Sequence, residues 1–242
     1  METARKVWGG MLAFILLMVS GCDHETTVLE THPLDLRGAT TAGFQSVYLV
    51  MSDGVRIAVD VAVPEDYPGG YPLPTILEMT RYWRNRGGPL PYSVERVLKR
   101  GFVWVAMDER GTGASFGEWQ EPLSDRALLD AWEVTEWIVS QEWSNGRVGA
   151  TGISYPGMAA YQMAGAPHPA LKAIVPMSDT YDLYEDLIFP GGVFNRGFLQ
   201  GWSDVVYALD RNTTLDFGDV TFRLRPVDED PDGELLQAVS YT

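Results

Sequence analysis

Hydrophobic and polar positions alternate with a period of two where the main body of the chain begins. Val47, Leu49 and Met51 alternate with other residues, and a Ser-Asp-Gly turn follows at 52–54. The valine and isoleucine positions of 55–63 then share one face. This pattern predicts an antiparallel hairpin.

After the hairpin the pattern changes to apolar runs separated by stretches of helical period. Two apolar runs, at residues 74–79 and 102–107, and two further segments, at 147–151 and 171–175, predict strands. The second run is apolar throughout, as expected of a parallel strand covered on both faces. Three stretches predict helices, at residues 94–100, 125–140 and 156–164. A hairpin followed by alternating strands and helices predicts an α/β fold with a mostly parallel sheet.

The regular alternation stops after Met177. Residues 180–210 are aromatic and acidic and helical in places, whereas 211–242 hold short strand-like pieces with no evident core of their own. Glu185 and Asp186 could bind a substrate ammonium group, but their acidic pattern is more typical of a solvated helix face.

The start of the chain has the pattern of an export signal. Two basic residues precede an apolar stretch over 7–19, which is too short to span a bilayer. Residues 19–22, Val-Ser-Gly-Cys, resemble a bacterial lipobox, in which Cys22 is lipidated and becomes the mature N-terminus. We therefore expect a protein lipid-anchored in the bacterial cell envelope, on the extracytoplasmic, periplasmic side of the membrane. An uncleaved membrane anchor and a short buried helix are the alternatives.

Composition excludes several classes of function. The formal net charge of −15 argues against a nucleic-acid partner and against electrostatic docking on anionic lipid. One cysteine excludes an intramolecular disulfide, and three scattered histidines disfavour a metalloenzyme. The glycine-bearing segment 108–115 has no lysine placed to meet a phosphate. We therefore expect neither a metal nor another cofactor.

The strongest chemical signal is the segment 152–157, Gly-Ile-Ser-Tyr-Pro-Gly, between a predicted strand and a predicted helix. A serine hydroxyl is a poor nucleophile and must be lifted clear of the backbone to meet a base, which a sharp strand-to-helix turn achieves. The small Gly152 and Gly157 let strand and helix approach closely. The usual pattern is Gly-x-Ser-x-Gly, whereas here Pro156 takes the fifth position and glycine the sixth. The context nevertheless favours Ser154 as a nucleophile over a structural serine.

This segment, together with Trp-Ser-Asn-Gly-Arg-Val-Gly at 143–149, resembles the Xaa-Pro dipeptidyl-peptidase and cocaine-esterase family of serine hydrolases, in the α/β-hydrolase superfamily. That family has Gly-x-Ser-Tyr-x-Gly, so the shifted glycine agrees with it. Asp-Glu-Arg-Gly-Thr-Gly-Ala-Ser at 108–115 and Asp-Gly-Val-Arg-Ile-Ala at 53–58 agree as well. The resemblance covers about residues 46–205.

The resemblance implies hydrolysis of ester or amide bonds, including those of Xaa-Pro peptides, through an acyl-enzyme on Ser154. It also implies two donors to the oxyanion of the tetrahedral intermediate: the backbone N–H of Tyr155 and the hydroxyl of Tyr82. The alternative for Tyr82 is an aromatic packing residue. For Asp108 and Arg110 we favour a charged pair that braces the loop after a buried strand over a catalytic role.

The partners of a catalytic serine are the missing part of the pattern. A triad of this fold runs serine, acid, histidine along the chain, and of the three histidines only His168 follows Ser154. A helix of about ten residues, roughly 15 Å long, separates the two, whereas a general base must come within about 3 Å. We therefore expect His168 to be structural, and the triad acid and histidine to lie outside this chain.

The residue patterns and the family resemblance together predict four segments along the chain: a lipoprotein signal peptide over 1–21, a tether over 22–45, the N-terminal part of an α/β-hydrolase domain over 46–179, and the start of a helical cap with a truncated tail over 180–242. The chain is then a fragment of a longer enzyme, truncated before the last strands and inactive alone, with low stability because an apolar sheet edge is exposed. The alternative is a catalytically inactive membrane-tethered lipoprotein remnant or binding module.

Overall fold

A computed structural model describes residues 44–213, 215–216 and 221–235, all within one compact unit that spans Thr31–Thr242. Cys22, the predicted signal peptide and almost all of the predicted tether lie outside the described residues, so the lipid anchor stays a prediction. Within the described part of the chain, no helix has the length and apolar character needed to cross a membrane.

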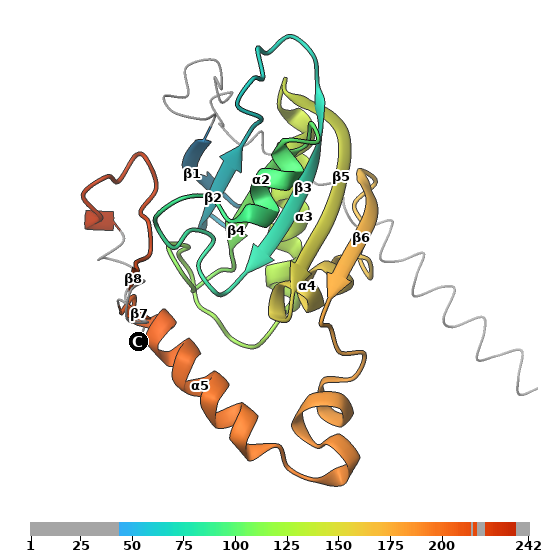
Figure 1. The fold of residues 1–242 in the computed structure, drawn as a ribbon, viewed down its shortest axis with the longest axis vertical. Helices are drawn as coiled ribbons and strands as arrows, with labels where there is room; N and C mark the ends of the chain where they lie inside the picture. Colours follow the sequence, from blue (N-terminus) through green and yellow to red (C-terminus); the bar gives the residue numbers. More distant parts are fainter. Residues whose placement is uncertain (1–43, 214, 217–220, 236–242) are drawn as a thin grey trace, which may run out of the picture. The chain divides into compact units, whose positions relative to one another are not determined.

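The core of the fold is a six-stranded sheet with the order β1-β2-β4-β3-β5-β6 (Figure 1). Its strands are β1 (Phe44–Val50), β2 (Arg56–Ala62), β3 (Leu73–Thr80), β4 (Val103–Asp108), β5 (Ser144–Ile153) and β6 (Leu171–Met177). The β1–β2 hairpin and the β2–β4 pair are antiparallel, whereas β4, β3, β5 and β6 pair in parallel. The predicted hairpin and the mostly parallel α/β sheet are therefore confirmed.

Helices cover both faces of this sheet. The covering helices are α2 (Tyr92–Leu98), α3 (Asp125–Ser140) and α4 (Tyr155–Met163), and a further helix, α5 (Arg196–Asp210), follows later in the chain. On β4, Trp104 and Ala106 pack with α2, while Val103, Val105 and Met107 point to the opposite face and pack with α3 and α4. Because successive side chains of a strand alternate between faces, a strand covered on both must be apolar throughout, as β4 is.

The predicted helix over 125–140 forms with those bounds as α3. Ser124 caps it, since its hydroxyl accepts a hydrogen bond from the Ala127 N–H at 3.2 Å. The residues at i, i+3, i+4 and i+7, namely Ala127, Asp130, Ala131 and Val134, are buried. Asp130 is the charged residue on this face, and its carboxylate is part of an ion pair described below.

Two parts of the chain differ from the sequence-based expectation. Strand β5 begins at Ser144, three residues before the predicted strand over 147–151, because Ser144 pairs with Leu73 across an irregularity in the register. In the described part of the tail beyond 211, Val227 is buried against Ala58 and Ala114 of the main body. Two short strands, β7 (Leu215–Asp216) and β8 (Thr221–Phe222), form a small hairpin before it.

Among the described strands, β6 forms one edge of the sheet. Apolar side chains on this edge and at the end of β5 are open to solvent: Ile153 is 61%, Val175 55% and Met177 40% exposed. The predicted apolar edge is therefore present, and low stability of the chain stays a prediction.

Candidate active site

Ser154 sits at the turn between β5 and α4 and is exposed. Its backbone has φ 64° and ψ −125°, a conformation that residues with a side chain rarely adopt. Such a conformation costs about 1–3 kcal/mol and persists only where the surrounding structure imposes it. The strain is therefore located at the residue that the sequence predicts as the nucleophile.

Two close approaches impose this turn and explain the spacing of its glycines. A Cβ atom on Gly152 would lie 2.3 Å from the Cβ of Pro156, so the proline at the fifth position packs directly on the glycine. A Cβ atom on Gly157 would lie 2.6 Å from the carbonyl oxygen of Met177 on β6. The glycine at the sixth position is thus required because α4 contacts the backbone of the neighbouring strand at that residue.

The backbone N–H of Tyr155 is placed to act as an oxyanion donor. Tyr155 is the first residue of α4, and the first N–H groups of a helix have no acceptor within it. The helix N-terminus also carries partial positive charge, which favours a developing anion. The N–H of Met158 already donates to the carbonyl oxygen of Ser154 at 2.9 Å, which starts the helical pattern at the serine itself.

The side chain of Tyr155 ties this turn to the end of β4. Its hydroxyl donates to Oε2 of Glu109 at 2.6 Å and accepts from the N–H of Leu123 at 3.0 Å. Burial raises the pKa of Glu109 to about 7, although the hydrogen bond from Tyr155 opposes the shift. Burial, followed by the charge of Glu109, raises the pKa of Tyr155, so its hydroxyl stays protonated.

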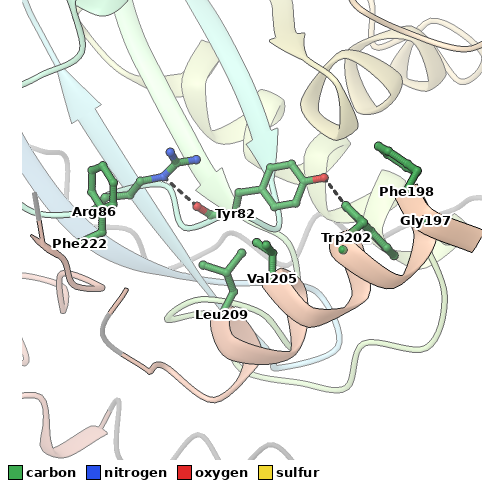
Figure 2. Close-up of a pocket in the computed structure, with 9 residues that line it drawn as sticks. Tyr82, Arg86, Gly197, Phe198, Trp202, Val205, Leu209 and Phe222 are labelled. Carbon is green, nitrogen blue, oxygen red and sulfur yellow. Dashed lines mark hydrogen bonds between the residues drawn. The ribbon is translucent and has the colours of Figure 1, made fainter. Parts of the chain in front are cut away.

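Tyr82 follows β3, the strand that lies beside β5, and parallel strands end at the same edge of a sheet. Its ring packs edge to face on the ring of Tyr155, with the centroids 5.8 Å apart. Its hydroxyl oxygen accepts a hydrogen bond from Nε1 of Trp202 at 2.7 Å (Figure 2). The structure thus brings Tyr82 next to Tyr155, the residue that follows the predicted nucleophile.

A cavity of about 600 Å³ opens beside Tyr82 (Figure 2). One side of it is formed by α5, and most of its lining is apolar. The lining residues are Tyr82, Arg86, Gly197, Phe198, Gly201, Trp202, Val205, Leu209 and Phe222. The cavity is of the size that holds a small organic ligand.

Asp108 and Arg110 are structural, as expected, but they do not pair with each other. Asp108 is fully buried and accepts hydrogen bonds from the N–H of Arg84 at 2.6 Å and from its guanidinium at 2.9 Å. Arg110 instead forms a two-bond pair with Asp130 of α3, with both distances 2.6 Å. The reason is register: β3 ends opposite Asp108, at Thr80, so the loop after β3 carries Arg84 to that carboxylate.

His168 lies where the sequence placed it, just before the start of β6 and therefore at the end of the sheet opposite Ser154. Its Nε2 contacts a carboxylate oxygen of Glu136, and its Nδ1 accepts from the N–H of Ala170 at 2.9 Å. Its ring packs on Trp132 at 4.8 Å between centroids. Both ring nitrogens are thus occupied far from the candidate nucleophile, in a structural role.

The acidic residues at the start of the predicted cap stabilise their own turn. The carboxylate of Asp186 accepts from the N–H groups of Tyr181 and Asp182, at 3.0 and 2.9 Å. Glu185 is exposed at the start of a six-residue π-helix, Leu183–Ile188. A short 3₁₀ turn, Pro190–Gly192, follows it. Within the described ranges, no group of His, Cys, Asp or Glu side chains is arranged to hold a metal ion.

Sequence reasoning missed three residues that shape this region: Arg84, Glu109 and Trp202. Glu109 and Arg84 are charged groups that follow buried strands, so their burial could have been suspected. The partners of these two side chains could not be predicted, because the partners depend on which strands lie side by side in the sheet. The contact of Trp202 with Tyr82 joins residues 120 positions apart and has no signal in the sequence.

Known proteins that are similar to this chain in sequence include peptidases and esterases. A sequence profile described as X-Pro dipeptidyl-peptidase (S15 family) matches residues 53–222. A Mycobacterium bovis protein to which serine esterase activity is attributed is 36% identical over 214 residues, which cover 79% of this chain and 34% of that protein. The cocaine esterase of a Rhodococcus species is 35% identical over 167 residues, covering 66% of this chain and 28% of that one. This chain therefore spans about a third of the length of these curated relatives.

A solved structure of a CocE/NonD family hydrolase from Staphylococcus aureus shares the fold. It superposes with a TM-score of 0.61 at 24% identity, covering 70% of this chain and 33% of that chain. At this identity the likeness concerns the fold, which is that of an α/β hydrolase.

Proposed function

The chain belongs to the X-Pro dipeptidyl-peptidase (S15) family, and from this premise we propose that it supplies the nucleophile and the oxyanion donors of a serine hydrolase that cleaves ester or amide bonds. The observation that carries the proposal is the strained, exposed Ser154 at φ 64°, held between β5 and the first residue of α4. Strain of this kind at a strand-to-helix turn is a feature of nucleophilic serines.

In the proposed reaction, Oγ of Ser154 attacks the carbonyl carbon of the substrate, and a histidine base takes the hydroxyl proton. The carbonyl oxygen becomes an oxyanion, which accepts hydrogen bonds from the N–H of Tyr155 and the O–H of Tyr82. Collapse of the intermediate expels the alcohol or amine, which leaves with the proton from the base. Water then attacks the carbonyl carbon of the acyl-enzyme while the histidine takes the proton of the water. The histidine returns this proton to Oγ of Ser154, and the carboxylic acid is released.

We propose that the triad acid and histidine come from outside this 242-residue sequence. The placement of His168 at the opposite end of the sheet supports this, because a general base needs contact at about 3 Å. The share of the curated relatives that this chain spans supports it as well. On this proposal the chain alone has the nucleophile but not the base.

The cavity beside Tyr82 supports a substrate with an apolar group next to the scissile carbonyl. Most of its lining is apolar, including Phe198, Val205 and Leu209 of α5, and Arg86 is the charged residue that lines it. We propose an ester or amide with an apolar acyl portion, for which p-nitrophenyl esters and Xaa-Pro-p-nitroanilides are the probes. Turnover of the Xaa-Pro anilides would favour a peptidase, and turnover of the esters alone an esterase.

We further propose that the protein is lipid-anchored through Cys22 on the extracytoplasmic side of a bacterial membrane. The basic start, the apolar stretch over 7–19 and the lipobox-like residues 19–22 support this. Intact-mass analysis of the protein taken from its own membranes tests it. A diacylglyceryl-modified Cys22 at the mature N-terminus is expected, and a retained segment 1–21 would refute it.

Labelling with a fluorophosphonate tests the central proposal, because such probes react with activated serines and place a phosphoryl oxygen in the oxyanion hole. The native protein from its own membranes should label at Ser154, and Ser154→Ala should abolish labelling. Ser178→Ala is the matched control, since Ser178 follows β6 at the same edge and also has a positive φ, 50°. A protein that never labels would favour the alternative, a catalytically inactive membrane-tethered binding module.

A further inference from the structure

The loop that follows β3 holds helix α5 by polar contacts on both sides of Tyr82. Arg81, which is 1% exposed, donates from Nη2 to both carboxylate oxygens of Asp210, at 3.0 and 2.9 Å. Trp83 donates from Nε1 to the carbonyl oxygen of Leu209 at 3.2 Å. The two residues that flank Tyr82 therefore fix the C-terminal turn of α5 against the end of β3.

Tyr82 itself contacts the same helix two turns earlier. Nε1 of Trp202 donates to its hydroxyl oxygen at 2.7 Å (Figure 2). The guanidinium of Arg81 lies 5.3 Å from the centre of the Trp202 ring, which holds the indole from its face. Three consecutive residues of one loop thus each contact α5.

The direction of the hydrogen bond determines what Tyr82 can do. An indole N–H is a donor only, so the oxygen of Tyr82 must be the acceptor. A phenol that accepts in this way still has its own proton, and the accepted bond fixes the position of its oxygen. The Tyr82 proton therefore remains available to another acceptor.

We propose that Trp202 is a positioning residue for the reaction: its indole N–H holds the Tyr82 hydroxyl so that the phenolic proton is directed at the oxyanion. The inference rests on the proposed function of Tyr82 as an oxyanion donor. It extends that function to α5, because docking of this helix then completes the oxyanion hole. Trp202 also lines the apolar cavity, so its test must separate positioning from substrate packing.

The sharpest perturbation replaces Trp202 with β-(3-benzothienyl)alanine, which keeps the shape of the indole and removes its N–H. In the native protein this change should slow fluorophosphonate labelling of Ser154 about tenfold, the value of one neutral hydrogen bond. Tyr82→Phe should slow it about 100-fold, as loss of an oxyanion donor does. The same replacement at Trp132, which packs on His168, is the matched control and should leave the rate unchanged.

The double variant decides between positioning and packing. If Trp202 acts through the Tyr82 hydroxyl, replacing it in the Tyr82→Phe background should have no further effect on the labelling rate. An equal slowing in both backgrounds would overturn the inference while leaving the proposed function intact. Absence of any labelling of the wild type would instead refute the proposed function, and this inference with it.

A second readout does not depend on reactivity. In spectra of protein with ¹⁵N-labelled tryptophan, Tyr82→Phe should shift the indole N–H resonance of Trp202 and speed its exchange with solvent. Trp202→Phe assigns that resonance. An unchanged Trp202 resonance in the Tyr82→Phe variant would overturn the inference whatever the labelling shows.

Discussion

Replacement of Glu109 by glutamine should remove part of the pH dependence of stability. Glu109 is 1% exposed, and burial raises its pKa from 4.5 to about 7. Because the folded state binds this proton more tightly than the unfolded state, the free energy of unfolding must fall as pH rises between these two values. The stability that the protonated acid provides is fully present below about pH 4.5 and is lost by about pH 7.

The size of the effect follows from the difference between the two pKa values, which corresponds to about 3 kcal/mol once both states are ionised. Glutamine has the same shape and can still accept the hydrogen bond from the Tyr155 hydroxyl, now at 2.6 Å, but it does not titrate. As pH rises from about 5 to about 8, the free energy of unfolding of Glu109→Gln should therefore rise by about 2–3 kcal/mol relative to that of the wild type.

The assay is urea unfolding of both proteins at a series of pH values, with the free energy of unfolding compared at each. Glu78→Gln is the matched control, since burial also raises the pKa of Glu78 to about 7 while Glu78 lies on β3, away from Tyr155. Each variant should lose its own share of the pH slope, and the shares should add in the double variant. Parallel pH profiles for wild type and Glu109→Gln would refute the reasoning.

Four further variants have expected outcomes. Gly157→Ala should lower the free energy of unfolding by about 2–3 kcal/mol and abolish phosphonate labelling, because its Cβ would lie 2.6 Å from a strand carbonyl oxygen. Gly197→Ala, with open space around its Cβ, should leave the free energy of unfolding unchanged or raise it by up to about 1 kcal/mol. Arg84→Met should cost about 3–5 kcal/mol in urea unfolding, since it leaves the buried Asp108 without its cation; a loss below about 1 kcal/mol would contradict this. His168→Asn should lower the melting temperature but leave the labelling rate unchanged, and a lost rate would reassign this histidine to the active site.

The elements of this fold could be predicted from the sequence because each has a local cause. The period-two pattern of 55–63 and the unbroken apolar run of β4 follow from which faces of a strand are covered. Ser124 and the apolar positions of α3 mark a helix with its bounds. The nucleophile turn could be predicted for the same reason, since its glycines, proline and serine lie within six consecutive residues.

Only the tertiary structure decided which groups meet at the edge of the sheet. The strand order places the ends of β3, β4 and β5 together, so Asp108 pairs with Arg84 and not with the nearby Arg110. The need for glycine at the sixth position of the nucleophile turn comes from the backbone of β6, a different part of the chain. The contact of Trp202 with Tyr82 depends on how α5 docks. Local patterns record the periodicity and turns of one segment, whereas such pairings depend on the packing of segments that are distant in sequence, and no single segment carries that information.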